Sequence, residues 1–194
     1  MRTIEHFIDG QTVVGTSGRY SDVFDPNSGK VQAKVSLANA AELDRAVRSA
    51  AAAQPGWAAV NPQRRARVMF EFVRLLNAHK QELAELLASE HGKVVSDAHG
   101  DVLRGLEVIE FACGIPHLQK GEYTQGAGPR IDVYTAHQPL GVVAGVTPFN
   151  FPAMIPMWMF GPAIATGNAF ILKPSERDPS VPVRLAELMI EAGL

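Results

Sequence analysis

Apolar residues recur at helical spacing through the middle of the chain. Over 61–92 they step by three and four residues, which predicts one long helix that opens on an Asn-Pro pair and ends at a glycine. The same spacing predicts a helix over 94–113. An earlier helix is expected to begin after Asn39, its N-cap, and to end at Pro55, because a Pro-Gly pair breaks a helix.

Shorter alternating stretches flank this helical region. At the N-terminus, Asp9-Gly10 lies between two β-rich runs and predicts a hairpin turn. A second turn is predicted at 25–29, where the sequence reads DPNSG. Beyond the helices, residues 119–140 are rich in turn signals and then alternate between apolar and polar side chains. This pattern suggests an antiparallel arm.

The pattern then changes to strand–helix–strand–helix. The runs GVVAGV (141–146) and AFILKP (169–174) are continuously apolar, which is typical of parallel strands covered on both faces. Helices are predicted over roughly 152–166 and 180–192. The series predicts an α/β fold, whose next element would be a third parallel strand. Two parallel strands leave an open hydrophobic edge, so the fold is interpreted as cut off part-way.

Composition and charge exclude several classes of protein. The chain has 194 residues, of which 46% are hydrophobic and 20% charged, as in ordinary globular domains. The net charge of −2 argues against nucleic acid as the main partner, since surfaces that bind it are basic. A single cysteine excludes a disulfide within the chain and favours a reducing compartment. MRTIEHFIDG matches no targeting peptide, and prolines interrupt the apolar stretch 141–172, so we expect a cytoplasmic protein without a membrane span.

The candidate functional residues lie in the two loops that follow the predicted parallel strands. Ligands of open parallel sheets bind beyond the carboxyl ends of the strands, and the loops VTPFNFP and LKPSERDPS follow these ends. In the first loop, Asn150 is flanked by Phe149 and Phe151 in apolar surroundings. Burying an amide without a partner costs about 1–3 kcal/mol. We therefore expect this side chain to be buried and to pair with a structural hydrogen-bond partner or with a ligand.

The second loop carries charges that suit a nucleotide. Lys173 is a point cation for a hydroxyl or phosphate oxygen, and Glu176 is an acceptor for ribose hydroxyls. A carboxylate there also repels a 2′-phosphate, which favours NAD over NADP, and Arg177 is placed to line the adenosine side. Alternatively, the segment is only a charged, solvated loop before a helix. We interpret Ser175, Asp178 and Ser180 as cap residues of that helix.

These motifs carry a resemblance to a known family. GVVAGVTPFNFPAMIPMWMF followed by GNAFILKPSERDPS resembles the aldehyde dehydrogenase superfamily, and within it the CoA-acylating methylmalonate-semialdehyde (malonate-semialdehyde) dehydrogenases. TPFNFP with P-x-W-M-F, and KPSER in place of a plainer KPSE, favour the narrower match. The resemblance extends along the whole chain, from FIDG through DPNSGK and EHGK to EAGL.

The resemblance implies an architecture for the chain. An incomplete, Rossmann-like NAD-binding domain would span 1–118 and 141–194, with N-terminal β-hairpins and helices around a parallel sheet. The segment 119–140 would be the oligomerisation arm of a homo-oligomer, a dimer or a tetramer. Members of the family are more than twice as long. We therefore expect the catalytic domain and its nucleophilic cysteine to be absent from this chain, and the chain alone to be inactive.

The resemblance also implies a reaction. A cysteine thiolate attacks the aldehyde, NAD accepts the hydride, and the thioester passes its acyl group to coenzyme A while the β-carboxylate leaves as CO₂. Methylmalonate or malonate semialdehyde would thereby become propionyl-CoA or acetyl-CoA. The implied site residues are Asn150 as oxyanion-hole donor, Thr147 and Phe149 on the nicotinamide side, Lys173, Glu176 and Arg177 at the adenosine ribose, and Arg104 for the substrate carboxylate.

Other interpretations stay open. Arg104 is alternatively a surface arginine paired with Asp101 or Glu107. Cys113 lies on the apolar stripe of a helix without a neighbouring His or Lys, which favours a buried structural thiol. The histidines show no metal-ligand spacing, so no metal site is predicted. Two alternatives to the implied activity are a non-acylating aldehyde dehydrogenase and an inert, truncated assembly or nucleotide-binding module.

Overall fold

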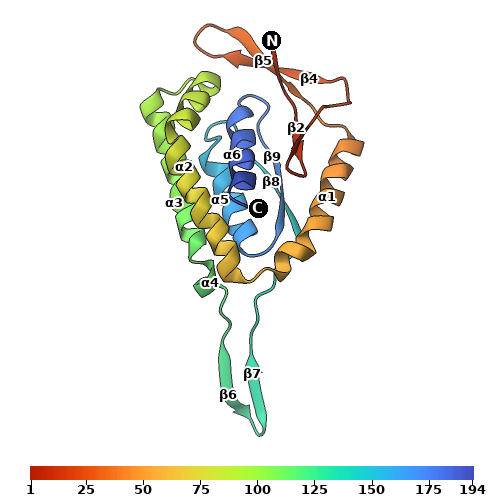
Figure 1. Cartoon of the computed structure of the whole chain (residues 1–194), viewed down its shortest axis with the longest axis vertical. Helices are drawn as coiled ribbons and strands as arrows, with labels where there is room; N and C mark the ends of the chain where they lie inside the picture. Colours follow the sequence, from red (N-terminus) through yellow and green to blue (C-terminus); the bar gives the residue numbers. More distant parts are fainter.

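The computed structural model describes residues 1–194, with short strands at one end of the molecule and a long two-stranded arm at the other (Figure 1). The N-terminal strands are β1 (Arg2–Ile4), β2 (His6–Ile8), β3 (Gln11–Val13), β4 (Tyr20–Asp25) and β5 (Lys30–Ser36). The predicted hairpin of β2 and β3 is confirmed, and its turn residues Asp9 and Gly10 have positive φ angles of 58° and 68°. The second predicted turn joins the antiparallel strands β4 and β5. β1 pairs in parallel with β5, which alternation along the chain does not reveal.

Four helices follow these strands. Their bounds are α1 (Ala40–Ala59), α2 (Pro62–His91), α3 (Val95–Cys113) and α4 (Ile115–Leu118). The predicted helices over 61–92 and 94–113 are confirmed. Both predicted asparagine caps are also present, because the Asn39 and Asn61 side chains accept main-chain N–H groups of the first turns of α1 and α2.

The prediction that Pro55 ends the first helix was wrong. α1 continues through Pro55 to Ala59. Tertiary contacts support this last turn, since the Trp57 indole packs against the core and its Nε1 donates a hydrogen bond of 2.8 Å to the carbonyl of Ile164. Packing therefore overrides the local preference of proline to stop a helix.

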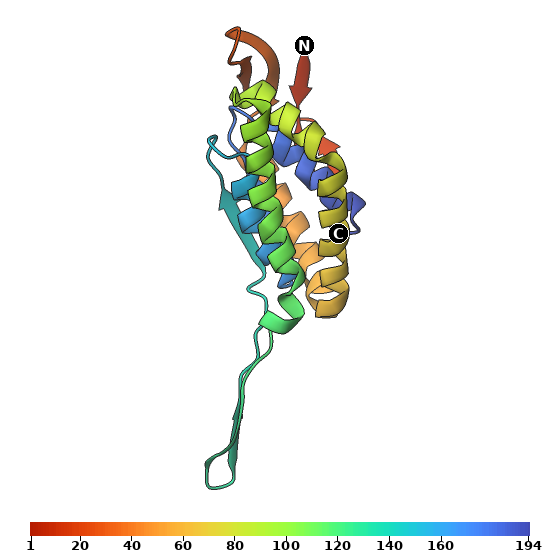
Figure 2. The ribbon, with the colours of Figure 1, turned by 90° about the vertical axis from the view of Figure 1, so that its left-hand side faces the viewer.

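The arm consists of β6 (Tyr123–Gly128) and β7 (Ile131–Tyr134), which pair antiparallel as predicted. Figures 1 and 2 show this pair as a narrow extension beyond the ends of the helices. Several of its large side chains are exposed, among them Tyr134 at 77%. The arm therefore makes no core of its own within this chain.

The last part of the chain contains β8 (Val142–Val146), α5 (Met154–Ala165), β9 (Ala169–Lys173) and α6 (Ser180–Glu191). β8 and β9 pair in parallel, which confirms the predicted α/β unit. The expectation that both strands are covered on both faces was wrong, because only Gly145 of β8 is buried and Val146 is 71% exposed. The sheet has only these two strands, so each leaves one edge unpaired. An open groove of about 790 Å³ with mainly apolar lining borders β9, α1, α6 and the β2–β3 hairpin.

The main core lies where α2, α3, α5 and α6 pack against one another. Phe160 of α5 stands between Phe72 of α2 and Phe170 of β9, with ring centroids 5.9 and 6.4 Å apart. α3 approaches α5 closely at Gly105, where a Cβ atom would lie 2.2 Å from the Cε of Met157. This close approach brings the N-terminal end of α5 against α3, which matters for the loop that precedes α5.

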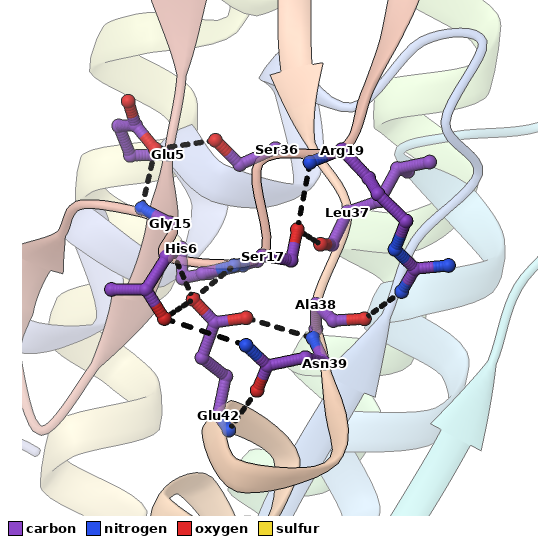
Figure 3. Close-up of polar contacts among 11 residues, drawn as sticks. Glu5, His6, Gly15, Ser17, Arg19, Ser36, Leu37, Ala38, Asn39 and Glu42 are labelled. Carbon is purple, nitrogen blue, oxygen red and sulfur yellow. Dashed lines mark hydrogen bonds and ion pairs between the residues drawn. The ribbon is translucent and has the colours of Figure 1, made fainter.

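A polar network joins the N-terminal hairpin to the start of α1 (Figure 3). The Glu42 carboxylate accepts the main-chain N–H groups of Thr16 and, at 2.7 Å, of Asn39, while the Asn39 side chain accepts the Glu42 N–H at 2.9 Å. The Asn39 N–H makes the largest contribution to lowering the pKa of Glu42, so this side chain is ionised at neutral pH. Glu5 closes the hairpin end by accepting the N–H of Gly15 at 2.9 Å.

Removing the Asn39 side chain tests this network. The substitution Asn39→Ala deletes the acceptor for the Glu42 N–H and is expected to lower the free energy of unfolding by about 1 kcal/mol, measured by urea or thermal unfolding of the protein. Asn39→Ser is the matched control. Serine keeps a capping oxygen, so this variant should show only a fraction of that loss in free energy of unfolding. Equal losses for the two variants would show that the cap is not what stabilises this junction.

Candidate functional site

The two loops predicted to share a site leave the same edge of the sheet. The carboxyl ends of β8 and β9 are Val146 and Lys173, which are partners in the parallel register. One further main-chain hydrogen bond, from the Thr147 N–H to the Lys173 carbonyl at 3.1 Å, ties the two strand ends together. The parallel register thus places both loops side by side, as ligand sites of open α/β sheets require.

Two charge contacts join residues of these loops. The Arg177 guanidinium lies 4.6 Å from the centroid of the Phe149 ring, so the two loops touch. Lys173 and Glu176 form an ion pair of 3.1 Å, in which both side chains are about half exposed. Exposed pairs of this kind contribute roughly 0–1 kcal/mol, so a ligand can replace this contact at small cost. Hydrogen bonding to the Glu176 N–H and to Lys173 lowers the pKa of Glu176, which keeps it an ionised acceptor.

Thr147 lies at the buried base of this edge. It is 4% exposed, and its Oγ1 has no hydrogen-bond partner within the chain. Buried hydroxyl groups are nearly always paired, so this one needs a partner from outside the chain. A water molecule, a bound ligand or a further protein segment at the edge would supply it.

The structure places Asn150 differently from the sequence prediction. We expected a buried amide, but Asn150 is exposed, and its side chain makes no hydrogen bond. The flanking rings do not enclose it, because Phe149 lies against Arg177 and Phe151 lies against Lys93. The amide is therefore not engaged by its own main chain and is free to donate to a group at the strand end.

Lys93 is a residue that sequence reasoning missed. It lies in the turn between α2 and α3, and its Nζ donates a hydrogen bond of 2.7 Å to the main-chain carbonyl of Asn150. The same ammonium pairs with Asp101 at 2.9 Å and lies 4.0 Å from the centroid of the Phe151 ring. Asp101 in turn accepts the N–H of Met154, the first residue of α5, at 2.7 Å. No spacing along the chain signals these contacts, since they join segments from two distant parts of the sequence.

The prediction that Ser175, Asp178 and Ser180 cap the last helix was wrong. The N-cap of α6 is Pro179, and no side chain of the second loop caps the helix. Glu90 of α2 takes this role by accepting the Ser180 N–H at 3.0 Å, and it also pairs with Arg2 at 2.9 Å. Asp178 is 2% exposed, and its Oδ1 has no partner. Burial, together with the nearby negative charge of Glu90, raises the pKa of Asp178 to about 7.

No hydrogen bond or ion pair joins Arg104 to the other predicted site residues. Its side chain is exposed and forms no ion pair or hydrogen bond, so the alternative pairing with Asp101 or Glu107 was wrong. Asp101 is instead occupied by Lys93. The Arg104 carbonyl accepts a hydrogen bond of 3.2 Å from Trp158 Nε1, which ties this part of α3 to α5. Its role toward a substrate carboxylate stays a prediction.

Cys113 is a buried thiol, as predicted. It is 8% exposed on α3, and burial, followed by the charge of Glu110, raises its pKa to about 11. A thiol with this pKa is protonated at neutral pH and is a poor nucleophile. No group of three or more His, Cys, Asp or Glu side chains is arranged to hold a metal ion, and no helix has the length and apolar character needed to cross a bilayer.

Comparison with known proteins matches this fold to one family. The model of the aldehyde dehydrogenase family matches residues 13–194. The chain is 49% identical over 194 residues to malonate-semialdehyde dehydrogenase of Pseudomonas aeruginosa, and 51% identical over 193 residues to malonate-semialdehyde dehydrogenase 3 of Geobacillus kaustophilus. All of the chain is matched in both cases, but it spans only about 40% of the length of these relatives.

Solved structures give the same match. A Sinorhizobium meliloti protein with a provisional assignment as a methylmalonate-semialdehyde dehydrogenase, solved in complex with NAD, is 68% identical and superposes with a TM-score of 0.99. Methylmalonate-semialdehyde dehydrogenase from Oceanimonas doudoroffii is 48% identical, with a TM-score of 0.98. Each comparison covers 100% of this chain and 40% of the solved chain.

The buried Asp178 predicts a pH dependence of stability. Its folded pKa of about 7 exceeds its ordinary value of 3.8, so the folded chain binds more protons than the unfolded chain between these values. Its contribution to stability is therefore complete below the ordinary pKa and is lost as the pH rises through the folded one. Asp178→Asn should gain thermal stability relative to the unchanged protein as the pH is raised from about 5 to about 8.

The control for this prediction is an exposed aspartate. Asp22→Asn should show no such pH-dependent gain, because the Asp22 side chain is 44% exposed, unlike the buried Asp178, and faces Lys34 at 3.8 Å. A pH-independent difference between Asp178→Asn and the unchanged protein would contradict a raised pKa at Asp178.

Proposed function

Because the chain belongs to the aldehyde dehydrogenase family, we propose that it is the coenzyme-side portion of an NAD-dependent, CoA-acylating semialdehyde dehydrogenase. The single observation that carries this proposal is the free Asn150 amide. It stands at the end of β8, next to a second loop whose charges suit a dinucleotide. Residues 1–118 and 141–194 form the incomplete NAD-binding domain in this proposal.

The proposed role of Asn150 is to stabilise negative charge. When a cysteine thiolate adds to an aldehyde, the carbonyl oxygen becomes an oxyanion. A preorganised amide N–H directed at this oxygen typically accelerates such a step by about 10²–10³-fold. Lys93 holds the Asn150 carbonyl and the Asn150 side chain is unengaged, so the amide is available as such a donor. The nucleophile is not Cys113, since that thiol is buried and has a pKa of about 11.

NAD fits the groups at the strand ends. It supplies the hydride acceptor of the reaction. Lys173 and Glu176 are exposed, weakly paired and able to bind ribose hydroxyls, while the ionised Glu176 disfavours a 2′-phosphate. Arg177 lines the adenosine side, and Thr147 and Phe149 lie on the nicotinamide side in this proposal.

The substrate is proposed from the names of the relatives, which support methylmalonate or malonate semialdehyde. Coenzyme A as acceptor, with propionyl-CoA or acetyl-CoA as product, is proposed from the resemblance of the TPFNFP and KPSER motifs to the CoA-acylating enzymes. Arg104 carries an exposed guanidinium without an intramolecular partner, which suits the bidentate binding of a carboxylate. The β-carboxylate of the substrate is the group it would hold.

The arm of residues 119–140 is assigned to oligomerisation. It stands away from the body of the molecule (Figure 2). Its apolar side chains are exposed, and no other part of the chain covers them. These are Tyr123, Ile131, Val133 and Tyr134, with exposures between 48% and 77%. A second copy of the protein would bury them in a dimer or a tetramer.

The product distinguishes the proposed activity from its alternatives. We expect the intact protein to form NADH from malonate semialdehyde only when coenzyme A is present, and to release acetyl-CoA and CO₂. NADH formation at the same rate without coenzyme A would identify a non-acylating enzyme with water as acceptor. Absence of turnover in an intact protein that binds NAD would identify a nucleotide-binding module.

Substitution of Asn150 tests the proposed catalytic group. Asn150→Ala in the intact protein should lower kcat by about 10²–10³-fold while leaving KM for NAD little changed, because only the transition-state contact is lost. Cys113→Ser is the matched control and should keep kcat close to that of the unchanged protein. A kcat for Asn150→Ala equal to that of the control would contradict the role of this amide.

A further inference from the structure

The turn that carries Asn150 is held at both of its ends by one ion pair. At the first end, the Lys93 ammonium donates to the Asn150 carbonyl at 2.7 Å. At the second end, the Asp101 carboxylate accepts the Met154 N–H at 2.7 Å. Lys93 and Asp101 pair with each other at 2.9 Å, so the two ends of the turn are tied to a single charged unit.

This arrangement restrains the main chain and leaves the side chain free. The bond to the Asn150 carbonyl fixes the peptide plane between Asn150 and Phe151, and the Lys93 ammonium also lies over the Phe151 ring. The side-chain amide of Asn150 accepts and donates nothing within the chain. The restrained backbone therefore fixes the position from which the Asn150 side chain extends, while no contact within the chain restrains the amide itself.

The Lys93–Asp101 pair is largely buried, which suits a role in fixing the geometry of the turn. The Asp101 side chain is fully buried and the Lys93 side chain is 16% exposed. Both oxygens of Asp101 are used, one by Lys93 and the other by Met154. Buried ion pairs often add little net stability compared with apolar residues, because desolvation offsets the attraction, and in some proteins they select one geometry over its competitors.

From these contacts we propose that Lys93 and Asp101 are positioning residues for the Asn150 amide. The pair holds the turn so that the amide is directed at the oxygen on which charge develops, and neither residue touches the reacting atoms. This inference rests on the proposed function, since it requires that Asn150 is the oxyanion donor. A displacement of about 1 Å of such a group is enough to slow an enzyme by about 10²-fold.

The experiment measures steady-state kinetics of variants of the intact protein. Lys93→Met removes the donor to the Asn150 carbonyl but leaves the Asp101 carboxylate buried without its partner. The paired variant Lys93→Met/Asp101→Asn avoids this buried charge, because asparagine still presents an oxygen to the Met154 N–H. Lys80→Met, at an exposed position on α2, is the matched control, and thermal unfolding checks that each variant is folded.

We expect both the single and the paired variant to lower kcat by about 10–100-fold with KM for NAD changed by less than about threefold. Lys93→Arg keeps a cationic donor and should recover part of the loss. When Asn150→Ala is added to either variant, the rate should fall to that of Asn150→Ala alone and no further, because the residues act through one group.

Three results would overturn the inference. The first is a kcat within about threefold of the control for the paired variant, while Asn150→Ala is impaired. The second is a loss that multiplies with that of Asn150→Ala, which would mean that Lys93 acts elsewhere. The third is a raised KM for NAD at unchanged kcat, which would assign the pair to cofactor binding. If Asn150→Ala itself keeps full activity, the proposed function fails first, and this inference fails with it.

Discussion

The parallel pairing of β8 with β9 determines where the proposed site residues of the two loops lie. Because Val146 and Lys173 are register partners, the loops that follow them leave the same edge of the sheet, and the Thr147 N–H adds one more bond between them. A shift of this register by one residue would turn each side chain to the other face and separate the two loops. The unpaired hydroxyl of Thr147 and the contact of Arg177 with Phe149 both follow from this single constraint.

Helices α3 and α5 complete the site by restraining the loop that carries Asn150. α3 approaches α5 where Gly105 offers no side chain, and Asp101, one turn earlier, reaches the first N–H of α5. Lys93 then links Asp101 to the Asn150 carbonyl. The result is a turn whose backbone is held by the ion pair while the Asn150 amide stays available to donate to a developing oxyanion.

The periodicity of the sequence predicts most of the elements, because a helix or strand that buries one face repeats its apolar residues at a characteristic spacing. Local breaker and capping signals fail at Pro55, where the packing of Trp57 sustains the helix, and at α6, where Glu90 from a distant helix replaces the local caps. The expectation of burial also fails for Asn150, whose apolar neighbours in sequence turn toward cations instead of enclosing the amide. In each case the deciding contact comes from a remote segment that no local pattern contains.

The most direct test is a crystal structure of the intact protein with NAD bound. The adenosine ribose should lie between Lys173 and Glu176, with the Lys93 bond to the Asn150 carbonyl retained and the Asn150 amide directed at a cysteine of the catalytic domain. A dinucleotide bound away from the ends of β8 and β9, or an Asn150 amide bonded to its own main chain, would contradict the proposed site.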